Sequence, residues 1–425
     1  MSDVIYSPFI PNGEVTVPPS KSDVHRAIIC ASLSKGKSTI SPVALSNDIK
    51  ATIRCIKALG ASAEITDGVL TVDGSRMFNN KTATLDCGES GSTLRFFIPV
   101  ASAGNVNATF IGQGRLPQRP IGIFTETLPK AGVECKTEGG LPLEVSGKLK
   151  SGRFEIPGNV SSQFITGLMF ALPLLDGDSD IVLTSPIESV GYIDMTIYTM
   201  SKFGVKVETT DYGWHIKGNQ SYKPTEYITD GDWSQAAFFM VAGAINGDIT
   251  VKGVNKNSAQ GDKKIAEILS QFGAEVIWND TSVQVKKGDL KAITIDASQI
   301  PDLVPVLSVC ANFAKGTTKI INAERLRIKE CDRLEATAKL LNNLGGNVKE
   351  LSDGLEITGV EKLTGNSVDG YNDHRIVMSA GVCASKLEQG TTIESTFAMS
   401  INKSYPDFYI DYNSIGGKAN VLDLR

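Results

Sequence analysis

Small, hydroxyl-bearing or basic residues stand together at several points of the sequence, and most of these residue types suit the binding of phosphate and carboxylate groups. These points are Lys21-Ser22 with Arg26, Gly91-Ser92-Thr93 with Arg95, Ser161-Ser162-Gln163, Trp233-Ser234-Gln235, Pro301-Asp302 and Asp373-His374-Arg375. An arginine fork binds a pair of anionic oxygens through two hydrogen bonds, and the first turn of a helix attracts anions through its N–H groups. The sequence therefore predicts a site for small anions where these segments begin helices that converge.

Further cations stand in loops that contain proline or glycine. They are Arg115, Arg119, Lys329, Arg333 and Lys403. Each of them alone could be an ordinary surface charge, but a neighbouring proline stiffens the backbone and holds an arginine in place. The net charge of the chain is −5, so it does not favour nucleic acid as a whole. A ligand with several negative charges must be held by a local cluster of these cations.

Length and composition set the bounds for this site. A chain of 425 residues with 41% hydrophobic and 21% charged residues is expected to form two globular domains. It contains no apolar run of the roughly 18–20 residues that a membrane span needs. The segment MSDVIYSPFIPNG does not resemble a signal peptide, so we expect a cytoplasmic protein. The seven cysteines lack metal-ligand spacing and are expected to be reduced thiols, without a metal.

One type of segment, a helix that ends in glycine and precedes a hairpin, recurs along the chain. Its marker glycines are Gly60, Gly132, Gly204, Gly273, Gly345 and Gly417, separated by 72, 72, 69, 72 and 72 residues. Glycine suits the position after a helix end, where a positive φ is required. The helices are predicted to be amphipathic. One face carries Ile49, Ile53, Ile56 and Leu59 in the first copy, and Leu334, Ala338, Leu341 and Leu344 in the fifth.

A second type of helix alternates with the first and carries the chemistry-bearing residues at its start. The predicted starts are Ser20, Gly91, Ser161, Trp233, Pro301 and Asp373. These helices are rich in apolar and small residues all round, which is typical of buried helices. The repeating unit is thus helix, strand, helix, strand, strand over about 70 residues. Six such units predict an α/β protein with two similar domains of three units each.

The same segments resemble the 5-enolpyruvylshikimate-3-phosphate (EPSP) synthase family of enolpyruvyl transferases. The matching stretches are PPSKSDVHRA (18–27), ESGSTLRFF (89–97), LPQRPI (116–121), NVSSQFITGL (159–168), SPIESVGYIDMT (185–196), IPDLVPVL (300–307), RIKECDRL (327–334), YNDHRIVM (371–378) and NKSYPDF (402–408). They span nearly the whole chain in family order. The resemblance implies two domains, each of three βαβαββ units with buried parallel helices (an inside-out α/β barrel), joined by a double-crossover hinge.

The resemblance also implies a role for each site residue. For shikimate-3-phosphate it implies Lys21, Ser22, Arg26, Ser161, Ser162, Gln163, Ser189, Tyr192, Asp302 and Lys329. For phosphoenolpyruvate it implies Lys21, Gly91, Arg119, Gln163, Arg333, Arg375 and Lys403. The candidate catalytic groups are Asp302, Glu330 and Lys21. No cofactor and no metal is expected, because the protein's cations neutralise the charge of the substrates.

The implied reaction is an addition followed by an elimination, which releases phosphate. Asp302 is the candidate base for the 5-hydroxyl of the acceptor. Glu330 and Lys21 are candidates for the proton steps at C3 of phosphoenolpyruvate and at the departing phosphate. Two structural alternatives stay open: Asp302 could be a helix N-cap after Pro301, and Glu330 a solvated loop carboxylate. The sequence does not decide which group performs which proton transfer.

The domain boundaries follow from the repeat. Residues 219–230 look like a linker, and the first unit begins only at Pro18-Pro19. We therefore expect a discontinuous domain, 1–18 plus 229–425, with the phosphoenolpyruvate-side residues. An inserted domain, 19–228, would carry the shikimate-3-phosphate-side residues. The family expectation is a monomer that acts on small molecules, without nucleic-acid or membrane partners.

Some positions depart from the common family pattern. Many members have Asn-Ala-Gly-Thr where this chain has Glu89-Ser90-Gly91-Ser92, and a proline in place of Phe96. This difference leaves sensitivity to the inhibitor glyphosate open. Arg325 stands where some members have an asparagine that contacts shikimate-3-phosphate, so that contact is in doubt.

Two alternative functions remain. The sister transferase that acts on UDP-N-acetylglucosamine typically has a reactive cysteine in the loop corresponding to 111–124, where this chain has none. It also lacks the Ser161-Ser162-Gln163 triad. A non-catalytic binder of phosphorylated metabolites would need the basic residues but not Asp302 and Glu330, and both carboxylates are present.

Overall fold

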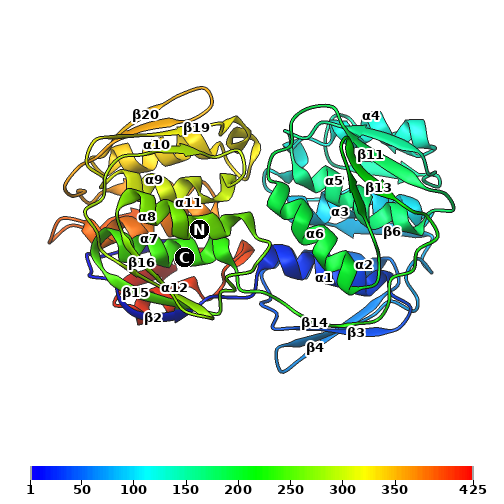
Figure 1. The fold of residues 1–425 in the computed structure, drawn as a ribbon, viewed down its shortest axis with the longest axis horizontal. Helices are drawn as coiled ribbons and strands as arrows, with labels where there is room; N and C mark the ends of the chain where they lie inside the picture. Colours follow the sequence, from blue (N-terminus) through cyan, green and yellow to red (C-terminus); the bar gives the residue numbers. More distant parts are fainter. Residues whose placement is uncertain (1, 424–425) are drawn as a thin grey trace. The chain divides into compact units, whose positions relative to one another are not determined.

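The computed structural model describes residues 2–423 of the chain, which folds into two compact units. One unit combines Met1–Pro18 with Asp230–Arg425, and the other is continuous from Pro19 to Thr229. The chain passes between them at Pro18–Pro19 and at Thr229–Asp230. We call them the discontinuous unit and the continuous unit (Figure 1).

The continuous unit contains three four-stranded sheets with the same topology. Across the first sheet the strands are, in order, β14 (Glu226–Ile228), β3 (Lys37–Ser41), β5 (Val69–Asp73) and β4 (Ser62–Thr66). Across the second they are β6 (Thr82–Asp86), β7 (Asn107–Ile111), β9 (Leu143–Ser146) and β8 (Glu134–Lys136). Across the third they are β10 (Arg153–Ile156), β11 (Ser179–Leu183), β13 (Gly213–Ile216) and β12 (Glu208–Thr210). The first pair of each sheet is parallel and the other two pairs are antiparallel. Each sheet is therefore one βαβαββ unit, and β14 returns at the end to complete the first.

The discontinuous unit repeats this topology in three further sheets. The strands of the fourth sheet are, in order, β2 (Asn12–Thr16), β15 (Asp248–Lys252), β17 (Ser282–Lys286) and β16 (Glu275–Trp278). Those of the fifth are β18 (Thr294–Asp296), β19 (Thr317–Ile321), β21 (Leu355–Thr358) and β20 (Asn347–Glu350). Those of the sixth are β22 (Ser367–Val368), β23 (Ile393–Ser395), β1 (Ser2–Tyr6) and β24 (Ala419–Asp423). β1 lies between β23 and β24 and is antiparallel to both. The two ends of the chain thus complete the sixth sheet together.

Six largely buried helices begin where the sequence predicts them, within a residue or two. They are α1 (Lys21–Leu33), α3 (Gly91–Ala103), α5 (Ser162–Ala171), α7 (Trp233–Asn246), α9 (Val304–Ala311, after the 3-10 turn Pro301–Leu303) and α11 (His374–Cys383). Almost every residue of these helices is buried, as their apolar composition predicts. The predicted α/β fold with two similar domains is confirmed.

The other six helices each bury one apolar face against the rest of their unit. They are α2 (Asn47–Ala58), α4 (Gly122–Thr127), α6 (Val190–Lys202), α8 (Ile265–Phe272), α10 (Arg333–Asn343) and α12 (Phe408–Ser414). In α2 and the residue after it, Ile49, Ile56 and Leu59 are buried and Ile53 is partly buried. The predicted amphipathic pattern is therefore confirmed. Within residues 2–423, none of the helices combines the length and the apolar character that a membrane crossing needs.

Five of the six marker glycines have the predicted positive φ, but the sixth prediction is wrong. The positive values are 112° at Gly60, 89° at Gly132, 80° at Gly204, 107° at Gly273 and 87° at Gly345. In the last copy Gly416 takes this conformation, with φ 92°, and Gly417 does not. α12 ends at Ser414 and its cap is Ile415, so the first glycine of the pair follows the cap. Gly417 has a different constraint, because an added Cβ would lie 2.4 Å from the carbonyl oxygen of Tyr412.

Candidate active site

In the continuous unit, the buried helices α3 and α5 begin with serine hydroxyl groups that cap the backbone. Ser90 Oγ accepts a hydrogen bond from the N–H of Thr93 at 3.2 Å, and Ser161 Oγ accepts from Gln163 N–H at 3.3 Å. These caps fix the first turns of α3 and α5. Ser162, predicted to bind substrate, is buried in the first turn of α5.

Lys21 and Arg26 lie on α1 and are held by different partners. Lys21 Nζ pairs with Asp48 Oδ2 at 2.8 Å, where the two side chains retain 16% and 14% of their surface exposed. Arg26 is buried, and its Nη1 donates to the carbonyl of Ser22 at 2.6 Å. Its Nη2 donates to the carbonyl of Tyr192 at 3.0 Å. Lys21, Ser22, Arg26 and Tyr192, all assigned from the sequence, therefore lie near one another in this unit.

Gln163 links α5 to α3. Its Oε1 accepts from Arg95 Nη1 at 2.6 Å, and its Nε2 donates to Ser92 Oγ at 2.9 Å. Arg95 Nη2 also donates to the carbonyl of Pro120 at 3.0 Å, next to Arg119. Arg95 thereby connects three segments, a positioning role that the sequence analysis did not assign. Its sequence signals were its place one turn into a predicted buried helix and its position beside Gly91-Ser92-Thr93, which pointed to anion binding and not to this positioning role.

Arg119 lies against the first turn of α3. A Cβ built on Gly91 would fall 2.8 Å from Arg119 Nη1, so any larger residue would displace the guanidinium group. Arg119 is 7% exposed. Ser189 is also buried, directly before α6, in the left-handed conformation with φ 56°. The structure therefore brings together Gly91 and Arg119, two of the residues that the resemblance assigns to phosphoenolpyruvate.

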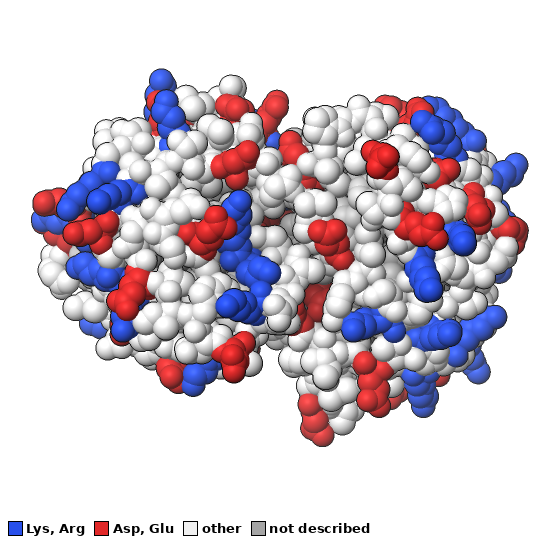
Figure 2. Space-filling view, in the orientation of Figure 1, with Lys and Arg blue, Asp and Glu red and all other residues white. Residues whose placement is uncertain are grey.

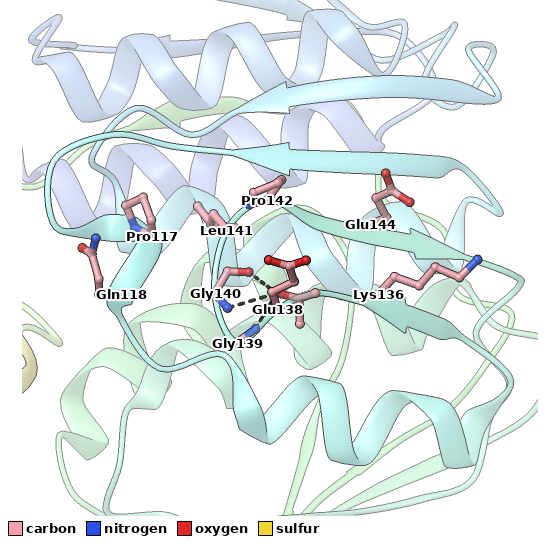
Figure 3. A pocket seen from close by; sticks show the side chains of 10 residues that line it. Pro117, Gln118, Lys136, Glu138, Gly139, Gly140, Leu141, Pro142 and Glu144 are labelled. Carbon is pink, nitrogen blue, oxygen red and sulfur yellow. Dashed lines mark hydrogen bonds between the residues drawn. The ribbon is translucent and has the colours of Figure 1, made fainter.

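A hairpin tip supports the loop that carries Arg119. The connection between β8 and β9 borders a hollow of about 920 Å³ lined also by Pro117 and Gln118 (Figure 3). Leu141 N–H donates to the carbonyl of Pro117 at 3.2 Å, and a Cβ on Gly140 would lie only 2.0 Å from that oxygen. Thr137 Oγ1 accepts from the N–H of Gly140 at 3.0 Å, which holds the tip in shape.

In the discontinuous unit, Arg333 is surrounded by three carboxylates. Its Nε pairs with Asp373 Oδ2 at 2.8 Å, its Nη1 with Asp302 Oδ1 at 3.0 Å and its Nη2 with Glu330 Oε2 at 2.7 Å. The Arg333 side chain is only 2% exposed. Burial alone would lower the pKa of Arg333, but the three carboxylates outweigh it and raise that pKa well above its usual value. Arg333 is therefore a permanent cation at the centre of this cluster.

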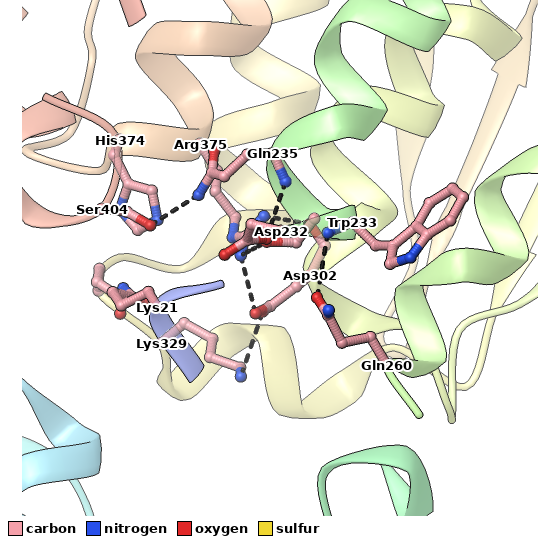
Figure 4. Close-up of polar contacts among 12 residues, drawn as sticks. Lys21, Asp232, Trp233, Gln235, Gln260, Asp302, Lys329, His374, Arg375 and Ser404 are labelled. Atoms are coloured by element: carbon pink, nitrogen blue, oxygen red, sulfur yellow. Dashed lines mark hydrogen bonds and ion pairs between the residues drawn. The ribbon is translucent and has the colours of Figure 1, made fainter. Parts of the chain in front are cut away.

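Asp302 forms ion pairs with two further cations (Figure 4). Arg375 Nη2 lies 3.0 Å from Asp302 Oδ2, and Lys329 Nζ lies 3.6 Å from Oδ1. Burial alone would raise the pKa of Asp302, but Arg375, Lys329 and Arg333 hold that pKa well below the usual value. Burial lowers the pKa of Lys329 to about 8, although Asp302 acts in the opposite direction. Asp302 is thus ionised at neutral pH in a cationic pocket.

The geometry does not fit the two structural alternatives for these carboxylates. The cap positions of the 3-10 turn and of α9 belong to Ile300 and Leu303, so Asp302 is not the N-cap of either. Glu330 is paired with Arg333 and its side chain is 20% exposed, so it is not a solvated loop carboxylate.

Two aspartates that sequence reasoning left without a role cap the helices of this cluster. Asp373 Oδ1 accepts from the N–H of Arg375 at 2.8 Å while its Oδ2 pairs with Arg333. Asp232 Oδ1 accepts from Gln235 N–H at 3.1 Å at the start of α7. An aspartate directly before a buried helix was the available signal, because that is the preferred N-cap position.

Lys403 and Arg325 are anchored on backbone carbonyls. Lys403 Nζ donates to the carbonyl of Asn372 at 2.5 Å, in the loop that precedes α11. Lys403 is 6% exposed. Arg325 is also buried and its Nη2 donates to the carbonyl of Ser298. Within the part of the chain that the structure describes, no group of three or more histidine, cysteine, aspartate or glutamate side chains is arranged so that it could hold a metal ion.

A solved structure identifies the class of protein to which this two-unit α/β fold belongs, the enolpyruvyl transferases. A solved EPSP synthase structure from Acinetobacter baumannii matches with a TM-score of 0.84 and 25% identity, over 100% of both chains. A sequence model of the family EPSP synthase (3-phosphoshikimate 1-carboxyvinyltransferase) matches residues 10–411. The chain therefore belongs to the EPSP synthase family.

Curated relatives support the same family over their full length. A 3-phosphoshikimate 1-carboxyvinyltransferase of Clostridium novyi is 48% identical over 96% of this chain and 95% of its own. Proteins of the same name from Clostridium acetobutylicum and Clostridium perfringens are 47% and 46% identical, and cover 100% and 98% of this chain.

Proposed function

We propose that this protein is a 3-phosphoshikimate 1-carboxyvinyltransferase, the enzyme that transfers the enolpyruvyl group of phosphoenolpyruvate to the 5-hydroxyl of shikimate-3-phosphate and releases phosphate. The observation that carries this proposal is the match of residues 10–411 to one family, with relatives of that name covering almost the whole chain. The reaction belongs to the shikimate pathway, which leads to aromatic amino acids. The same proposal assigns the protein to the cytoplasm as a monomer.

The buried cations are the groups that this reaction needs. Phosphoenolpyruvate carries a phosphate and a carboxylate, and the acceptor carries another of each, so the two ligands repel one another unless cations face them. Lys21, Arg26 and Arg119 supply positive charge in the continuous unit, and Arg375 and Lys403 in the other. This distribution supports the assignment of these residues to the substrates.

Asp302 is the proposed base. Its depressed pKa keeps the carboxylate ionised, and Arg333 and Arg375 hold both of its oxygens in fixed directions. A proton accepted from the 5-hydroxyl would leave an oxygen nucleophile to attack C2 of phosphoenolpyruvate. Glu330 and Lys21 are the proposed groups for proton transfer at C3 and at the departing phosphate.

Arg333 is already bonded to Asp302, Glu330 and Asp373 before any ligand binds. These bonds use four of the five N–H donors of the guanidinium group, so one phosphoenolpyruvate oxygen can bond to the remaining N–H of Nη1, and a second one must exchange with a carboxylate. Asp302 and Glu330 are the ones that can exchange, because their side chains are 18% and 20% exposed, whereas Asp373 is fully buried. Arg333 would thereby couple phosphoenolpyruvate binding to the orientation of both proposed catalytic carboxylates.

Phosphate release tests this proposal against its two alternatives. The purified protein is incubated with phosphoenolpyruvate and either shikimate-3-phosphate, UDP-N-acetylglucosamine or no acceptor. We expect phosphate only with shikimate-3-phosphate. Phosphate release with the UDP-sugar would identify the sister transferase. If no phosphate is released with either acceptor, the protein is a non-catalytic binder.

The same assay with Asp302→Asn checks the proposed base. Loss of a general base should lower kcat roughly 10²–10⁴-fold. The control is Asp353→Asn, since Asp353 is exposed and lies outside the cluster. Equal activity of Asp302→Asn and the control would contradict the assignment. Light scattering during gel filtration tests the proposed monomer.

A further inference from the structure

Arg26 is a buried cation whose hydrogen-bond acceptors are uncharged. It is 3% exposed, and its Nε donates to Thr196 Oγ1 at 2.8 Å. Its other two bonds go to the carbonyls of Ser22 and Tyr192. A guanidinium group has five N–H donors, so within the described residues these bonds leave two for an anionic ligand. Burial lowers the pKa of Arg26 to about 10, while Tyr192 and Asp23 act in the opposite direction and help to keep the group charged. A further contact is needed to fix the orientation of the group before the ligand arrives.

Two aromatic rings face the Arg26 guanidinium. Its Cζ lies 5.4 Å from the ring centroid of Phe96 and 5.8 Å from that of Tyr192. Both distances fall within the roughly 6 Å over which the face of an aromatic ring attracts a cation. Phe96 is 1% exposed, so water does not weaken this attraction.

The surroundings of Phe96 fix its ring. Phe170 meets it edge to face, with centroids 5.5 Å apart, and His25 meets it in the same way at 6.5 Å. Burial and the nearby Lys21 and Arg26 lower the pKa of His25 well below its usual value, so this imidazole is neutral and does not repel Arg26 at neutral pH.

We propose that Phe96 is a positioning residue for acceptor recognition: its ring face holds the Arg26 guanidinium so that the remaining N–H groups meet the anionic acceptor. Phe96 does not touch the substrate and acts through Arg26. This inference rests on the proposed function, in which Arg26 binds shikimate-3-phosphate. Tyr192 contributes both a ring face and a carbonyl to Arg26, whereas Phe96 contributes the ring face alone, which makes it the cleaner residue to test.

Ring fluorination separates the electrostatic role of Phe96 from its packing role. Each fluorine atom withdraws electrons from the ring face and weakens its attraction for a cation, while the ring keeps nearly the same shape. Phenylalanine analogues with one, two and three ring fluorine atoms are placed at position 96 of the full-length protein. The matched control is the same series at Phe170, which packs on Phe96 from α5 and is equally buried.

The dissociation constant of shikimate-3-phosphate is measured by titration calorimetry, and KM and kcat by phosphate release. We expect a stepwise weakening at position 96 that reaches about 3- to 30-fold with three fluorine atoms. KM for phosphoenolpyruvate and kcat should change by less than about twofold, because only acceptor binding is affected. The series at position 170 should leave acceptor binding unchanged.

A flat series at position 96, or an equal trend at position 170, would overturn the inference. Phe96→Leu adds an independent check, since leucine fills much of the space without a ring face. It should weaken acceptor binding more than Phe170→Leu does, even where both variants melt at similarly lowered temperatures. An unmodified protein that binds no shikimate-3-phosphate would instead overturn the proposed function itself.

Discussion

Arg333 binds three carboxylates, and this single side chain determines how the charges of Asp302, Glu330 and Asp373 are balanced. A lysine at this position could not replace it, because only a planar fork reaches several carboxylates in fixed directions. Asp302, in turn, contacts three cations and remains ionised. The chemical behaviour of the cluster therefore depends on tertiary pairing and not on the intrinsic properties of any one residue.

The lowered pKa of Lys329 predicts that acceptor binding depends on pH. Its pKa is lowered to about 8, chiefly by burial, so its charge is present below that pH and is lost as the pH rises through it. KM for shikimate-3-phosphate should therefore increase between about pH 7.5 and 9, whereas Asp302 stays ionised throughout. Steady-state kinetics over this range measures the effect.

Lys329→Arg is the matched variant for this prediction. Arginine keeps its charge to a much higher pH, so the increase in KM should be smaller in the variant. An increase of the same size in both proteins would assign the pH dependence to another group.

At the scale of elements, the hairpin between β8 and β9 supports the loop that positions Arg119. Gly140→Ala places a methyl group about 2.0 Å from the Pro117 carbonyl oxygen, so the loop must move. The φ of Gly140 lies outside the left-handed region, so alanine introduces this clash without backbone strain. We expect KM for phosphoenolpyruvate to rise roughly 10-fold or more, with a smaller change for the acceptor.

Gly122→Ala is the control for the hairpin, because it lies near the same loop and its added Cβ would meet only Glu126, at 3.8 Å. Both variants are compared by steady-state kinetics and by thermal unfolding. Equal KM values for phosphoenolpyruvate in the two variants would refute the supporting role of Gly140.

The helix starts could be predicted from sequence because their determinants are local. Small or hydroxyl-bearing residues at the helix starts, together with apolar composition, placed α1, α3 and α5 to within a residue or two. The roles of Arg95 and Asp373 could not be predicted, because they depend on side chains 68 and 40 positions away along the chain. The wrong assignment of Gly417 has a local cause, since the sequence pattern did not distinguish the two glycines of the pair.

At the scale of the whole molecule, the continuous unit contains all the strands of its own sheets. β14 returns within the same unit to pair in parallel with β3, so residues 19–229 need no strand from the rest of the chain. We expect this segment to fold when expressed alone and to unfold in one cooperative transition. It should release no phosphate, because Asp302 and Glu330 are missing.

Denaturant unfolding followed by circular dichroism and by tryptophan fluorescence measures this cooperativity, since Trp214 lies in this segment. The full-length protein serves as the control. If the transitions seen by circular dichroism and by fluorescence do not coincide, or if the segment shows no cooperative transition, the continuous unit depends on the discontinuous unit for its stability.

The position of β1 in the sixth sheet also determines which parts of the protein can fold first during translation. β1 is made long before both of its neighbours, β23 and β24, which follow the whole continuous unit along the chain. The continuous unit can therefore fold before β23 and β24 have been made, but the sixth sheet has to wait for both of them. Throughout that interval β1 has no strand to pair with. Its side chains Val4 and Tyr6, which are buried in the folded protein, stay exposed. We therefore expect β1 to be the segment of the nascent chain that a chaperone binds most readily.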